Sequence, residues 1–523
     1  MGIYVNPGNT AFREALNSAI YIDKTGLIAY TNKVLNTKQK NLCVSRPRRF
    51  GKSIAADMLS AYYSKGCNSH ALFSDLIIKE QKTYPEHLNQ HQVIRLDIQR
   101  FLETKQDLDT FISEIERKVI LELIKEFPDC NHFGVGSRLK DAFDQIFIQT
   151  GQGFVFIIDE WDCVFRMAKT REDIQKNYLD FLRGLFKGAE YVELAYMIGI
   201  LPIKKYGEHS AINIFDEYSM VDAKNLEEYF GFTRQEVQEQ CKKYNVNYED
   251  MAAWYDGYCL GKLHLYNPKS VVDALLWKDF QSYWTGTETY EALKVYIDMN
   301  FDGLKEAVIE MLGGKPCKIN IRQFQNDMTT FKTKDDVITL LIHLGYLTYD
   351  KRKNIAWIPN REVSQEFLNA VDGAGWNGLM QALHSSEELL YATWSFDGDA
   401  VAKGIDVIHQ ETASILKYND ENSLTCTILM AYYHAKAYYM NPILELPSGK
   451  GFADIVYLPQ RNTDKPALLI ELKWNKSAKG AIAQIKEKQY TSWIKNYTGD
   501  ILLIGINYNK NKGHSCIIEK FTK

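Results

Sequence analysis

The chain has 523 residues, of which 46% are hydrophobic, and a formal net charge of -4 at pH 7. This length predicts about two to four domains, because single domains usually hold about 100–200 residues, and the apolar content is ample for packed cores. The slight negative charge excludes a protein that coats nucleic acid through overall basicity, so any nucleic acid must be bound by a local patch.

The nine cysteines occur singly, without a Cys-x-x-Cys pair. This pattern is typical of reduced thiols in a cytoplasm and not of a disulfide framework or a cysteine zinc site. The N-terminus shows no basic segment followed by an apolar one, and no apolar run reaches the length of a membrane span. We therefore expect a cytoplasmic protein that has no membrane segment.

The segment from residue 41 to residue 59 predicts a strand, a loop and the start of a helix. Residues 1–40 form a lead-in to it, with a packing helix expected over residues 27–34. Residues 42–44 form a short apolar run, Pro47 and Gly51 break the pattern, and an apolar-periodic stretch follows. The first N–H groups of a helix lack internal partners and the helix dipole is positive there, so this end favours an anion. A capped helix behind a solvated basic loop is the alternative.

The residue types in this loop suit the phosphates of ATP. Lys52 would reach the β- and γ-phosphates, and the Ser53 hydroxyl would bind Mg²⁺. Arg48 and Arg49 add positive charge, which favours a triphosphate but also any other polyanion. The usual pattern has glycine six residues before the lysine, where this chain has Arg46.

Strands and helices alternate after the loop. A compact alternating strand is expected over residues 93–98, a long amphipathic helix over residues 108–127, and a strand buried on both faces over residues 154–158. This alternation predicts an α/β domain with a parallel sheet that is covered on both faces.

Two acids follow the buried strand, at the carboxyl edge where ligands of such sheets bind. Asp159 would hold Mg²⁺ through water, and Glu160 would polarise the water that attacks the γ-phosphate. The Lys-Ser pair and these acids, in this order, predict a nucleotide site. The residues expected to bind the nucleotide and its metal are Arg48, Arg49, Phe50, Gly51, Lys52, Ser53 and Asp159.

A further strand is expected over residues 192–200, and it ends in Leu201-Pro202 without the polar sensor residue that many ATPases place there. Arg166 and Arg183 are candidates for an arginine finger. For each of them, an exposed arginine on a helix is the alternative.

Several separated motifs resemble the AAA-ATPase-like family of bacterial and archaeal proteins over about residues 5–290. They are Arg46 to Ser53, Tyr21 to Thr25, Ile157 to Glu160, Trp254 to Tyr258, and Tyr266 to Val271. The family commonly writes its phosphate loop Arg-Pro-Arg-Arg-Phe-Gly-Lys-Ser, so the resemblance accounts for Arg46. It implies a P-loop ATPase from a bacterial source.

The middle of the chain is predicted to be helical. A helix over residues 226–230 would end at Gly231, and Thr233 would cap the next one. The aromatic cluster at residues 254–258 is either a packed turn or a base-stacking platform. A helix over residues 335–344 and a basic turn before a strand indicate a winged-helix module that contacts DNA, or a packing unit between domains.

A second chemical site is expected near the C-terminus, on strands over residues 449–459 and 467–474. Because strand side chains alternate, Glu471 and Lys473 share a face, and the neighbouring strand can bring Asp454 beside them. Asp454 and Glu471 would bind one or two Mg²⁺ ions, and Lys473 would orient or deprotonate the attacking water. An ion pair on a sheet edge is the alternative.

The surrounding elements resemble the PD-(D/E)xK nuclease superfamily over about residues 385–520. A long helix over residues 421–439, a helix over residues 481–490 and a strand over residues 501–506 flank the acidic strands. Ala453 stands where proline is usual in the motif. By position, the resemblance implies that Asp454 and Glu471 bind metal, that Lys473 is the catalytic lysine, and that Glu421, Gln484 and Tyr490 are accessory residues.

The sequence thus predicts an ATPase domain over residues 1–222, a helical lid and winged-helix region over residues 223–375, and a restriction-endonuclease-like domain over residues 385–523. We expect an ATP-regulated, Mg²⁺-dependent nuclease that acts on DNA in defence or mobile-element biology. In the alternative, the ATPase is a nucleotide switch and the C-terminal fold recognises nucleic acid or protein without cutting. Self-association is left open.

Overall fold

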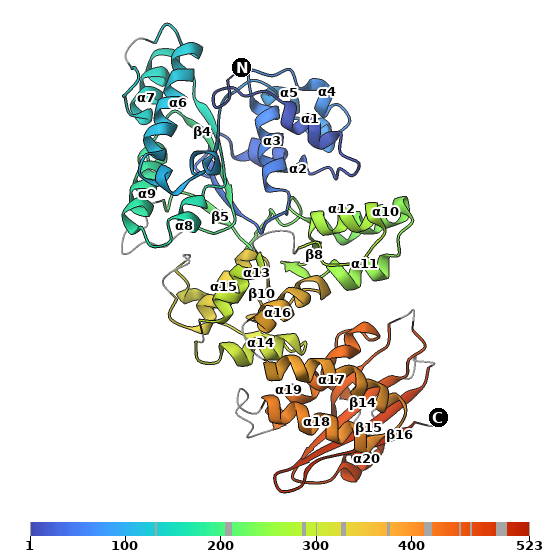
Figure 1. Ribbon diagram of the computed structural model, residues 1–523. Coiled ribbons are helices and arrows are strands. Elements are labelled where there is room, and N and C mark those ends of the chain that lie inside the picture. Colours follow the sequence, from blue (N-terminus) through green and yellow to red (C-terminus); the bar gives the residue numbers. More distant parts are fainter. Residues whose placement is uncertain are drawn as a thin grey trace. The chain divides into compact units, whose positions relative to one another are not determined.

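The computed structural model describes residues 2–130, 133–203, 212–284, 289–299, 301–325, 331–373, 377–412, 421–448, 451–460, 463–487 and 499–521 (Figure 1). The chain divides into two compact units. The first comprises Met1–Trp284 with Lys318–Val363, and the second comprises Thr285–Cys317 with Ser364–Lys523. Among the residues that the structure describes, no helix is long and apolar enough to cross a membrane.

The first unit is built on a parallel sheet of five strands in the order β2-β3-β4-β1-β5. Its strands are β1 (Asn41–Ser45), β2 (Gln92–Asp97), β3 (Phe154–Asp159), β4 (Val192–Gly199) and β5 (Asp216–Tyr218). Strand β3 is buried along its whole length, because helices cover both faces of the sheet. The predicted parallel sheet is therefore confirmed. Strand β4 separates β1, which leads into the loop predicted to bind phosphate (the phosphate loop), from β3, which ends in acids.

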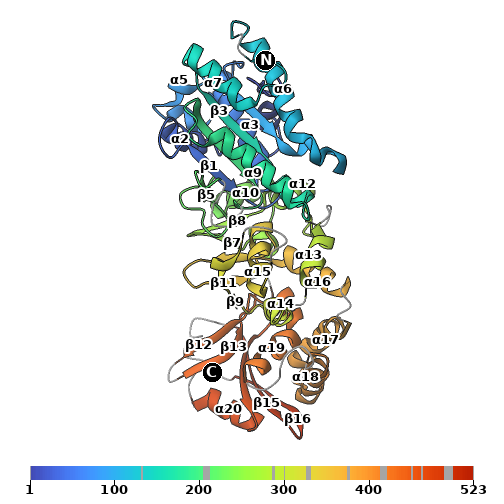
Figure 2. The same cartoon turned by 90° about the vertical axis from the view of Figure 1, so that its left-hand side faces the viewer.

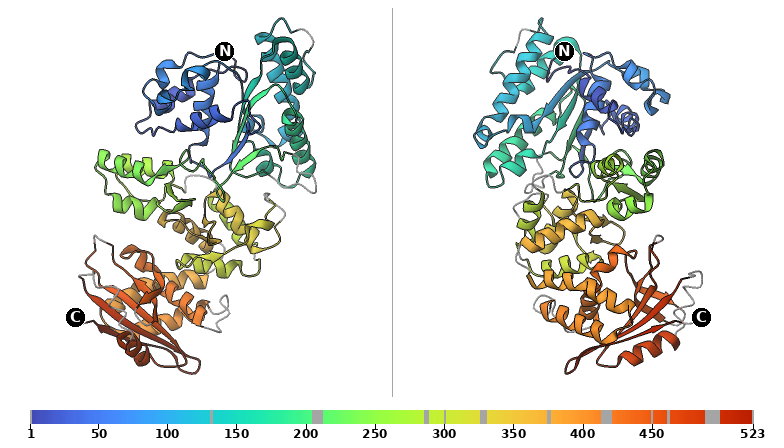
Figure 3. Two further views of the ribbon diagram at one scale, coloured as in Figure 1. Left: turned by 180° about the vertical axis from the view of Figure 1, so that it is seen from behind. Right: turned by 45° about the vertical axis from the view of Figure 1, so that its right-hand side comes forward.

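Helices on opposite sides enclose this sheet (Figures 1 and 3). On one side lie α1 (Thr10–Leu16), α2 (Gly26–Val34), α3 (Lys52–Tyr63), α4 (His70–Phe73) and α5 (Tyr84–His87). On the other lie α6 (Phe111–Glu126), α7 (Leu139–Thr150), α8 (Cys163–Met167) and α9 (Glu172–Phe186). Short 3-10 turns cover Ile77–Glu80, Ile98–Phe101 and Lys105–Asp109.

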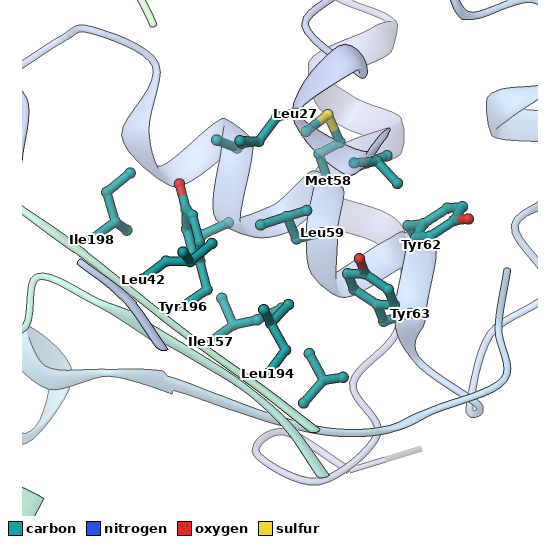
Figure 4. Packing of buried hydrophobic residues seen from close by; sticks show 14 of the residues in the cluster. Leu27, Leu42, Met58, Leu59, Tyr62, Tyr63, Ile157, Leu194, Tyr196 and Ile198 are labelled. Carbon is teal, nitrogen blue, oxygen red and sulfur yellow. The ribbon is translucent and has the colours of Figure 1, made fainter. Parts of the chain in front are cut away.

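The core beside the phosphate loop lies between α3 and the sheet. Leu59 of α3 packs in one cluster with Leu42 of β1, Ile157 of β3 and Tyr196 of β4, all fully buried (Figure 4). Leu27 of α2 closes the same cluster, so the predicted helix over residues 27–34 does pack beside this segment. Burial of this apolar surface fixes α3 on the sheet and thereby fixes the loop that precedes it.

The lid of the first unit is a helical layer with a small antiparallel sheet. Its helices are α10 (Arg234–Tyr244), α11 (Tyr248–Tyr255) and α12 (Pro268–Trp277), and its strands are β6 (Phe232–Thr233), β7 (Tyr258–Leu260) and β8 (Leu263–Tyr266). Thr233 caps α10 as predicted, in a capping box with Glu236.

The helix predicted over residues 226–230 is wrong, because this segment forms turns. Its backbone groups are used by the phosphate loop and not by a helix. The carbonyl oxygen of Leu226 accepts a hydrogen bond from Arg46, and the N–H of Gly231 donates to the carbonyl oxygen of Phe50. Tertiary hydrogen bonds thus override the local helical pattern.

The rest of the first unit contains α15 (Lys334–Leu344) and the hairpin strands β10 (Thr348–Asp350) and β11 (Ile355–Trp357). A short strand β9 (Cys317–Lys318) completes their sheet, and a 3-10 turn covers Ile321–Gln323. Gly345 ends α15 with φ of 89°, as the sequence predicted. The basic turn at residues 351–353 is exposed between the hairpin strands, and its contact with DNA stays a prediction.

The second unit holds a mixed sheet in the order β12-β13-β14-β15-β16, in which only β14 and β15 are parallel. The strands are β12 (Ile443–Ser448), β13 (Gly451–Tyr457), β14 (Ala467–Trp474), β15 (Ile501–Asn509) and β16 (Gly513–Lys520). Its helices are α13 (Thr289–Ile297), α14 (Leu304–Leu312), α17 (Asn377–Trp394), α18 (Gly398–Thr412), α19 (Glu421–Ala431) and α20 (Ala478–Glu487), and α16 (Arg361–Gly373) spans the boundary between the units.

Helix α20 covers one face of this sheet, and α17, α18 and α19 lie toward the other (Figure 2). Ile482 and Ile485 of α20 form a core with Leu469 of β14 and Leu503 of β15. The helix predicted over residues 421–439 is shorter than expected, since α19 ends at Ala431 and a 3-10 turn follows over Tyr433–Ala437.

Candidate functional site

The phosphate loop connects β1 to α3 at the carboxyl edge of the parallel sheet. Gly51 precedes the helix with φ of 84°, a left-handed conformation that glycine adopts without strain. The ammonium of Lys52 donates to the carbonyl oxygen of Pro47 at 2.9 Å, inside the loop, and the side chain of Ser53 is exposed. Burial lowers the pKa of Lys52, and the nearby carboxylates of Glu160, Asp162 and Asp159 oppose this shift.

Arg46 explains the departure from the usual glycine. Its side chain is fully buried, and its guanidinium donates to the carbonyl oxygens of Ser45 and Tyr218 at 2.8 Å and of Leu226 at 3.1 Å. The guanidinium also lies 5.0 Å from the ring centre of Phe230. Burial lowers the pKa of Arg46 to about 10, so the group stays charged at neutral pH. Arg46 therefore points away from the phosphate position and anchors the loop.

Three further loop residues contact the lid and the turn after α15. A Cβ atom on Gly345 would come within 2.6 Å of the Pro47 Cβ, so only glycine fits there. Arg49 donates to the carbonyl oxygen of Tyr283 at 2.6 Å. The ring of Phe50 meets the ring of Tyr258 edge-on with centroids 5.1 Å apart.

By contrast, Arg48 makes no hydrogen bond or ion pair in the described part of the chain. Its side chain is half-buried. It is therefore the loop arginine whose place is not fixed by such a protein contact.

The acid that ends β3 is held by an arginine that sequence analysis missed. Arg95 of β2 donates to Asp57 Oδ1 of α3 at 2.9 Å and to Asp159 Oδ2 at 3.3 Å. Burial raises the pKa of Asp57, and the charge of Arg95 opposes this shift. Burial also raises the pKa of Asp97, which lies beside Asp159 in the register of strands β2 and β3. A basic residue within the otherwise apolar strand at residues 93–96 was the signal available in the sequence.

Glu160 lies in a left-handed conformation, with φ of 50°, and is paired with Arg166. Burial raises the pKa of Glu160, and the charge of Arg166 opposes this shift. Arg166 is only 15% exposed and also lies 3.4 Å from Asp162, so it is not an exposed helix arginine. Arg183 is exposed and pairs with Asp180 at 2.9 Å along its own helix.

Asp162 links the ends of β3 and β4. Its carboxylate is fully buried and accepts from the N–H groups of Ile200 at 3.1 Å and Leu201 at 3.0 Å. A Cβ atom on Gly199 would come within 2.2 Å of Asp162 Oδ1. The end of β4 therefore has glycine, and not a polar sensor residue, because Trp161 and Asp162 occupy that space.

The motif at residues 21–25 makes structural contacts. Asp23 accepts from the N–H of Thr25 at 2.8 Å and from the N–H of Ile77 at 2.7 Å. Lys24 donates to Glu236 at 2.6 Å and to the carbonyl oxygen of Glu228 at 2.8 Å. These contacts tie the segment before α2 to the lid.

The second acidic site lies on β13, β14 and α20. Lys473 Nζ lies 2.9 Å from Glu471 Oε1, and Gln484 of α20 donates to the same oxygen. The Glu471 side chain is 1% exposed. Asp454 Oδ2 accepts from the N–H of Leu472 at 2.6 Å, so its carboxylate reaches the middle of β14.

The strand register supports this grouping. Ile455 of β13 pairs with Ile470 of β14 in an antiparallel ladder. One residue further along, Asp454 stands opposite Glu471, and directly opposed side chains share a face. The structure thus brings Asp454, Glu471, Lys473 and Gln484 together, and their roles stay a prediction.

Two accessory residues are not placed in this way. Glu421 is the first residue of α19, and its side chain lies outside what the structure describes. Tyr490 lies outside the described residues.

A third group of polar side chains was missed by sequence analysis. Asp406 and His409 of α18 and His514 of β16 each offer a ligand atom, and these atoms lie within 4.8 Å of one another. Burial lowers the pKa of both imidazoles. The Asp-x-x-His spacing was visible in the sequence, but His514 follows more than a hundred residues later.

Comparison with known proteins identifies two domains in this chain. Residues 8–208 match the model of a family described as a predicted AAA-ATPase, and residues 420–518 match a model of the PD-(D/E)XK nuclease superfamily. The chain therefore contains an AAA-ATPase-like domain and a PD-(D/E)XK nuclease superfamily domain, which confirms the two resemblances.

One curated relative comes from Azotobacter chroococcum mcd 1 and is described as "Uncharacterized protein in vnfD 5'region". It is 26% identical over 349 residues, which cover 65% of this chain and 62% of the relative. The matched region thus spans less than two thirds of that protein.

Replacement of Arg46 by alanine tests its anchoring role. The change leaves buried carbonyl oxygens without their donor, so we expect the free energy of unfolding to fall by about 2–4 kcal/mol. Denaturant unfolding followed by circular dichroism measures this. The matched control is Arg48→Ala, which should change the free energy by less than about 0.5 kcal/mol. Equal stability of the two variants would contradict the role given to Arg46.

Proposed function

We propose that this protein binds and hydrolyses ATP and that its nucleotide state controls a metal-dependent nuclease domain that acts on DNA. The proposed parts are an ATPase domain over residues 1–222, a lid and winged-helix region over residues 223–375, and a nuclease-like domain over residues 385–523. A role in defence or mobile-element biology belongs to the same proposal, as does DNA contact by the basic turn at residues 351–353.

The ATPase proposal is supported by the position of Lys52 at the start of α3. There the negative charges of the acids at the end of β3 act to raise the pKa of its ammonium group. We assign Lys52, Arg48 and Arg49 to the phosphates, together with the N–H groups of Phe50, Gly51 and Ser53 at the helix start. The Ser53 hydroxyl and Asp159 are oxygen donors, which fit Mg²⁺. With ATP bound, this ion would neutralise charge on the phosphates.

Glu160 is the proposed base for the attacking water. Its pairing with Arg166 holds the carboxylate in place, and the charge of Arg166 opposes the rise in pKa that burial causes, which favours the ionised form. For hydrolysis, Glu160 must turn from Arg166 toward the water, or share it, when ATP binds.

The nuclease proposal rests on one observation above all, the convergence of Lys473 and Gln484 on a single oxygen of buried Glu471. Asp454 and Glu471 offer carboxylate oxygens, which fit Mg²⁺ or Mn²⁺. Such an ion supplies a polarised phosphoryl oxygen and a water of lowered pKa. Gln484 orients Glu471, and Lys473 orients the attacking water and stabilises charge on the phosphate.

The ion pair itself supports a second candidate function. Lys473 and Glu471 neutralise each other at 2.9 Å, an arrangement that also suits a recognition module that does not cut. In this alternative, the ATPase is a nucleotide switch and the C-terminal fold binds nucleic acid or protein.

Replacement of Lys473 by alanine separates the two functions. If the domain cuts DNA, the wild type cleaves plasmid or linear DNA with Mg²⁺ or Mn²⁺, and Lys473→Ala lowers the rate at least about 100-fold, because a group that stabilises the transition state is lost. Gel assays of cleavage measure this, and binding of DNA is measured in parallel with Ca²⁺.

The matched control for Lys473 is Lys479→Ala, which removes an exposed lysine at the start of α20 and should leave cleavage unchanged. DNA binding without cleavage by the wild type, with either metal, would overturn the nuclease proposal in favour of the recognition module. Equal cleavage by the wild type and Lys473→Ala would remove Lys473 from the mechanism.

Replacement of Arg166 by alanine tests the role of Glu160 through pH. Loss of this cation raises the pKa of Glu160 further, since Arg166 opposes the effect of burial. A carboxylate base is active above its pKa and loses activity as the pH falls through it, so the acid limb of ATP hydrolysis should move to higher pH. Arg183→Ala is the matched control and should keep the wild-type profile. An acid limb that stays in place in Arg166→Ala would argue against Glu160 as the base.

A further inference from the structure

The side chains of Asp406, His409 and His514 connect helix α18 to the start of strand β16. His514 Nδ1 lies 2.7 Å from Asp406 Oδ1, and the N–H of His514 donates to the same oxygen at 3.0 Å. The ring centroids of His409 and His514 lie 5.2 Å apart. Gly513 has φ of 74°, and a Cβ atom there would come within 3.0 Å of Asp406, so the chain turns tightly around this carboxylate.

This cluster lies on the opposite face of the sheet from the proposed nuclease site. Glu471 of β14 is aligned with Gly505 of β15, and a Cβ atom on Gly505 would touch α20. Both positions therefore lie on the face of the sheet that α20 covers. Tyr508, an odd number of residues further along β15, therefore faces the other side. Tyr508 is aligned with His514 in the antiparallel pairing of β15 and β16, and its ring centroid lies 4.9 Å from that of His409. The cluster is thus distinct from Asp454 and Glu471.

The donor set of the cluster selects a class of ligand. Two imidazoles and one carboxylate suit Zn²⁺ and related transition metals, whereas Mg²⁺ and Ca²⁺ prefer oxygen donors alone. The Asp406 side chain is 36% exposed and that of His514 is fully buried, so the group lies at the edge of the core with one side toward solvent. That side leaves room for a water as fourth ligand.

We propose that Asp406, His409 and His514 bind one divalent transition-metal ion of the Zn²⁺ class. The ion takes the place of the proton that Asp406 and His514 share in the hydrogen bond. Tetrahedral ligand atoms around Zn²⁺ lie about 3.3 Å apart. The Asp406 and His514 ligand atoms, which are 2.7 Å apart, therefore open slightly on binding, and the His409 ring rotates toward them. The bound ion fastens α18 to β16, and this holds whether or not the proposed nuclease is active.

Zinc binding is measured on the full chain after chelator treatment and dialysis, by calorimetric titration with Zn²⁺ in excess Mg²⁺. Titration with Co²⁺, followed through its visible absorption, reports the ligand geometry independently. The variants are His409→Ala, which changes a half-buried ring, and His514→Gln. Circular dichroism checks that each variant is folded.

Two controls separate this site from other metal ligands. His434→Ala removes an imidazole elsewhere in the same unit, which lies 3.6 Å from Glu387. Asp454→Asn removes a carboxylate of the proposed nuclease site. We expect one equivalent of Zn²⁺ in the wild type and in both controls, and affinity at least about tenfold weaker in His409→Ala and His514→Gln.

Three results would overturn the proposal. They are the absence of stoichiometric Zn²⁺ binding by the wild type, equal affinity of the wild type and folded His409→Ala, and loss of Zn²⁺ binding in Asp454→Asn with retention in the two histidine variants. Failure of DNA cleavage would leave the zinc result unaffected.

Discussion

The buried guanidinium of Arg46 is the constraint on which the proposed phosphate site depends. A charge removed from water is costly unless hydrogen bonds replace its hydration, and here carbonyl oxygens from β1, β5 and residue 226 do so. The loop is consequently bound to segments that lie far apart in the sequence. Pro47, Arg49 and Phe50 extend the same attachment to the lid and to the turn at Gly345.

Under the proposed function, this attachment would couple phosphate binding in the loop to the position of the lid. Lys52 donates to the carbonyl oxygen of Pro47, whose ring packs on Gly345, so movement of Lys52 toward a phosphate releases a contact within the loop. The same loop positions Phe50 against Tyr258 of the lid. A ligand shifts such an equilibrium only by the difference in its affinity for the two states. The γ-phosphate is the group that we expect to supply this difference.

Two arginines organise the acids at the edge of the same sheet. Arg95 holds Asp57 and Asp159, and Arg166 holds Glu160 and Asp162. Each carboxylate is thereby kept near a cation in a partly buried setting, where an unpaired charge would be costly. Neither arginine stands in a motif, so spacing in the sequence gave no direct indication of these pairs.

The sequence predicted those parts of the fold that depend on local pattern. Strand β1, the loop, helix α3, the acidic end of β3 and the pairing of Asp454 with Glu471 all follow from periodicity and alternation. The predicted helix over residues 226–230 failed because its backbone groups bond to the phosphate loop. Arg95 and the cluster of Asp406, His409 and His514 could not be assigned, since their partners are brought near only by sheet register and helix packing.

The central claim is that ATP bound at Lys52 controls the C-terminal nuclease domain. The most direct test compares metal-dependent DNA cleavage by the wild type and by Lys52→Ala, with and without ATP, with exposed Lys65→Ala as the matched control. The account predicts that ATP changes the cleavage rate of the wild type and of Lys65→Ala, and that Lys52→Ala keeps its basal cleavage but no longer responds to ATP. Cleavage by the wild type that is the same with and without ATP, while ATP binding is intact, would contradict it.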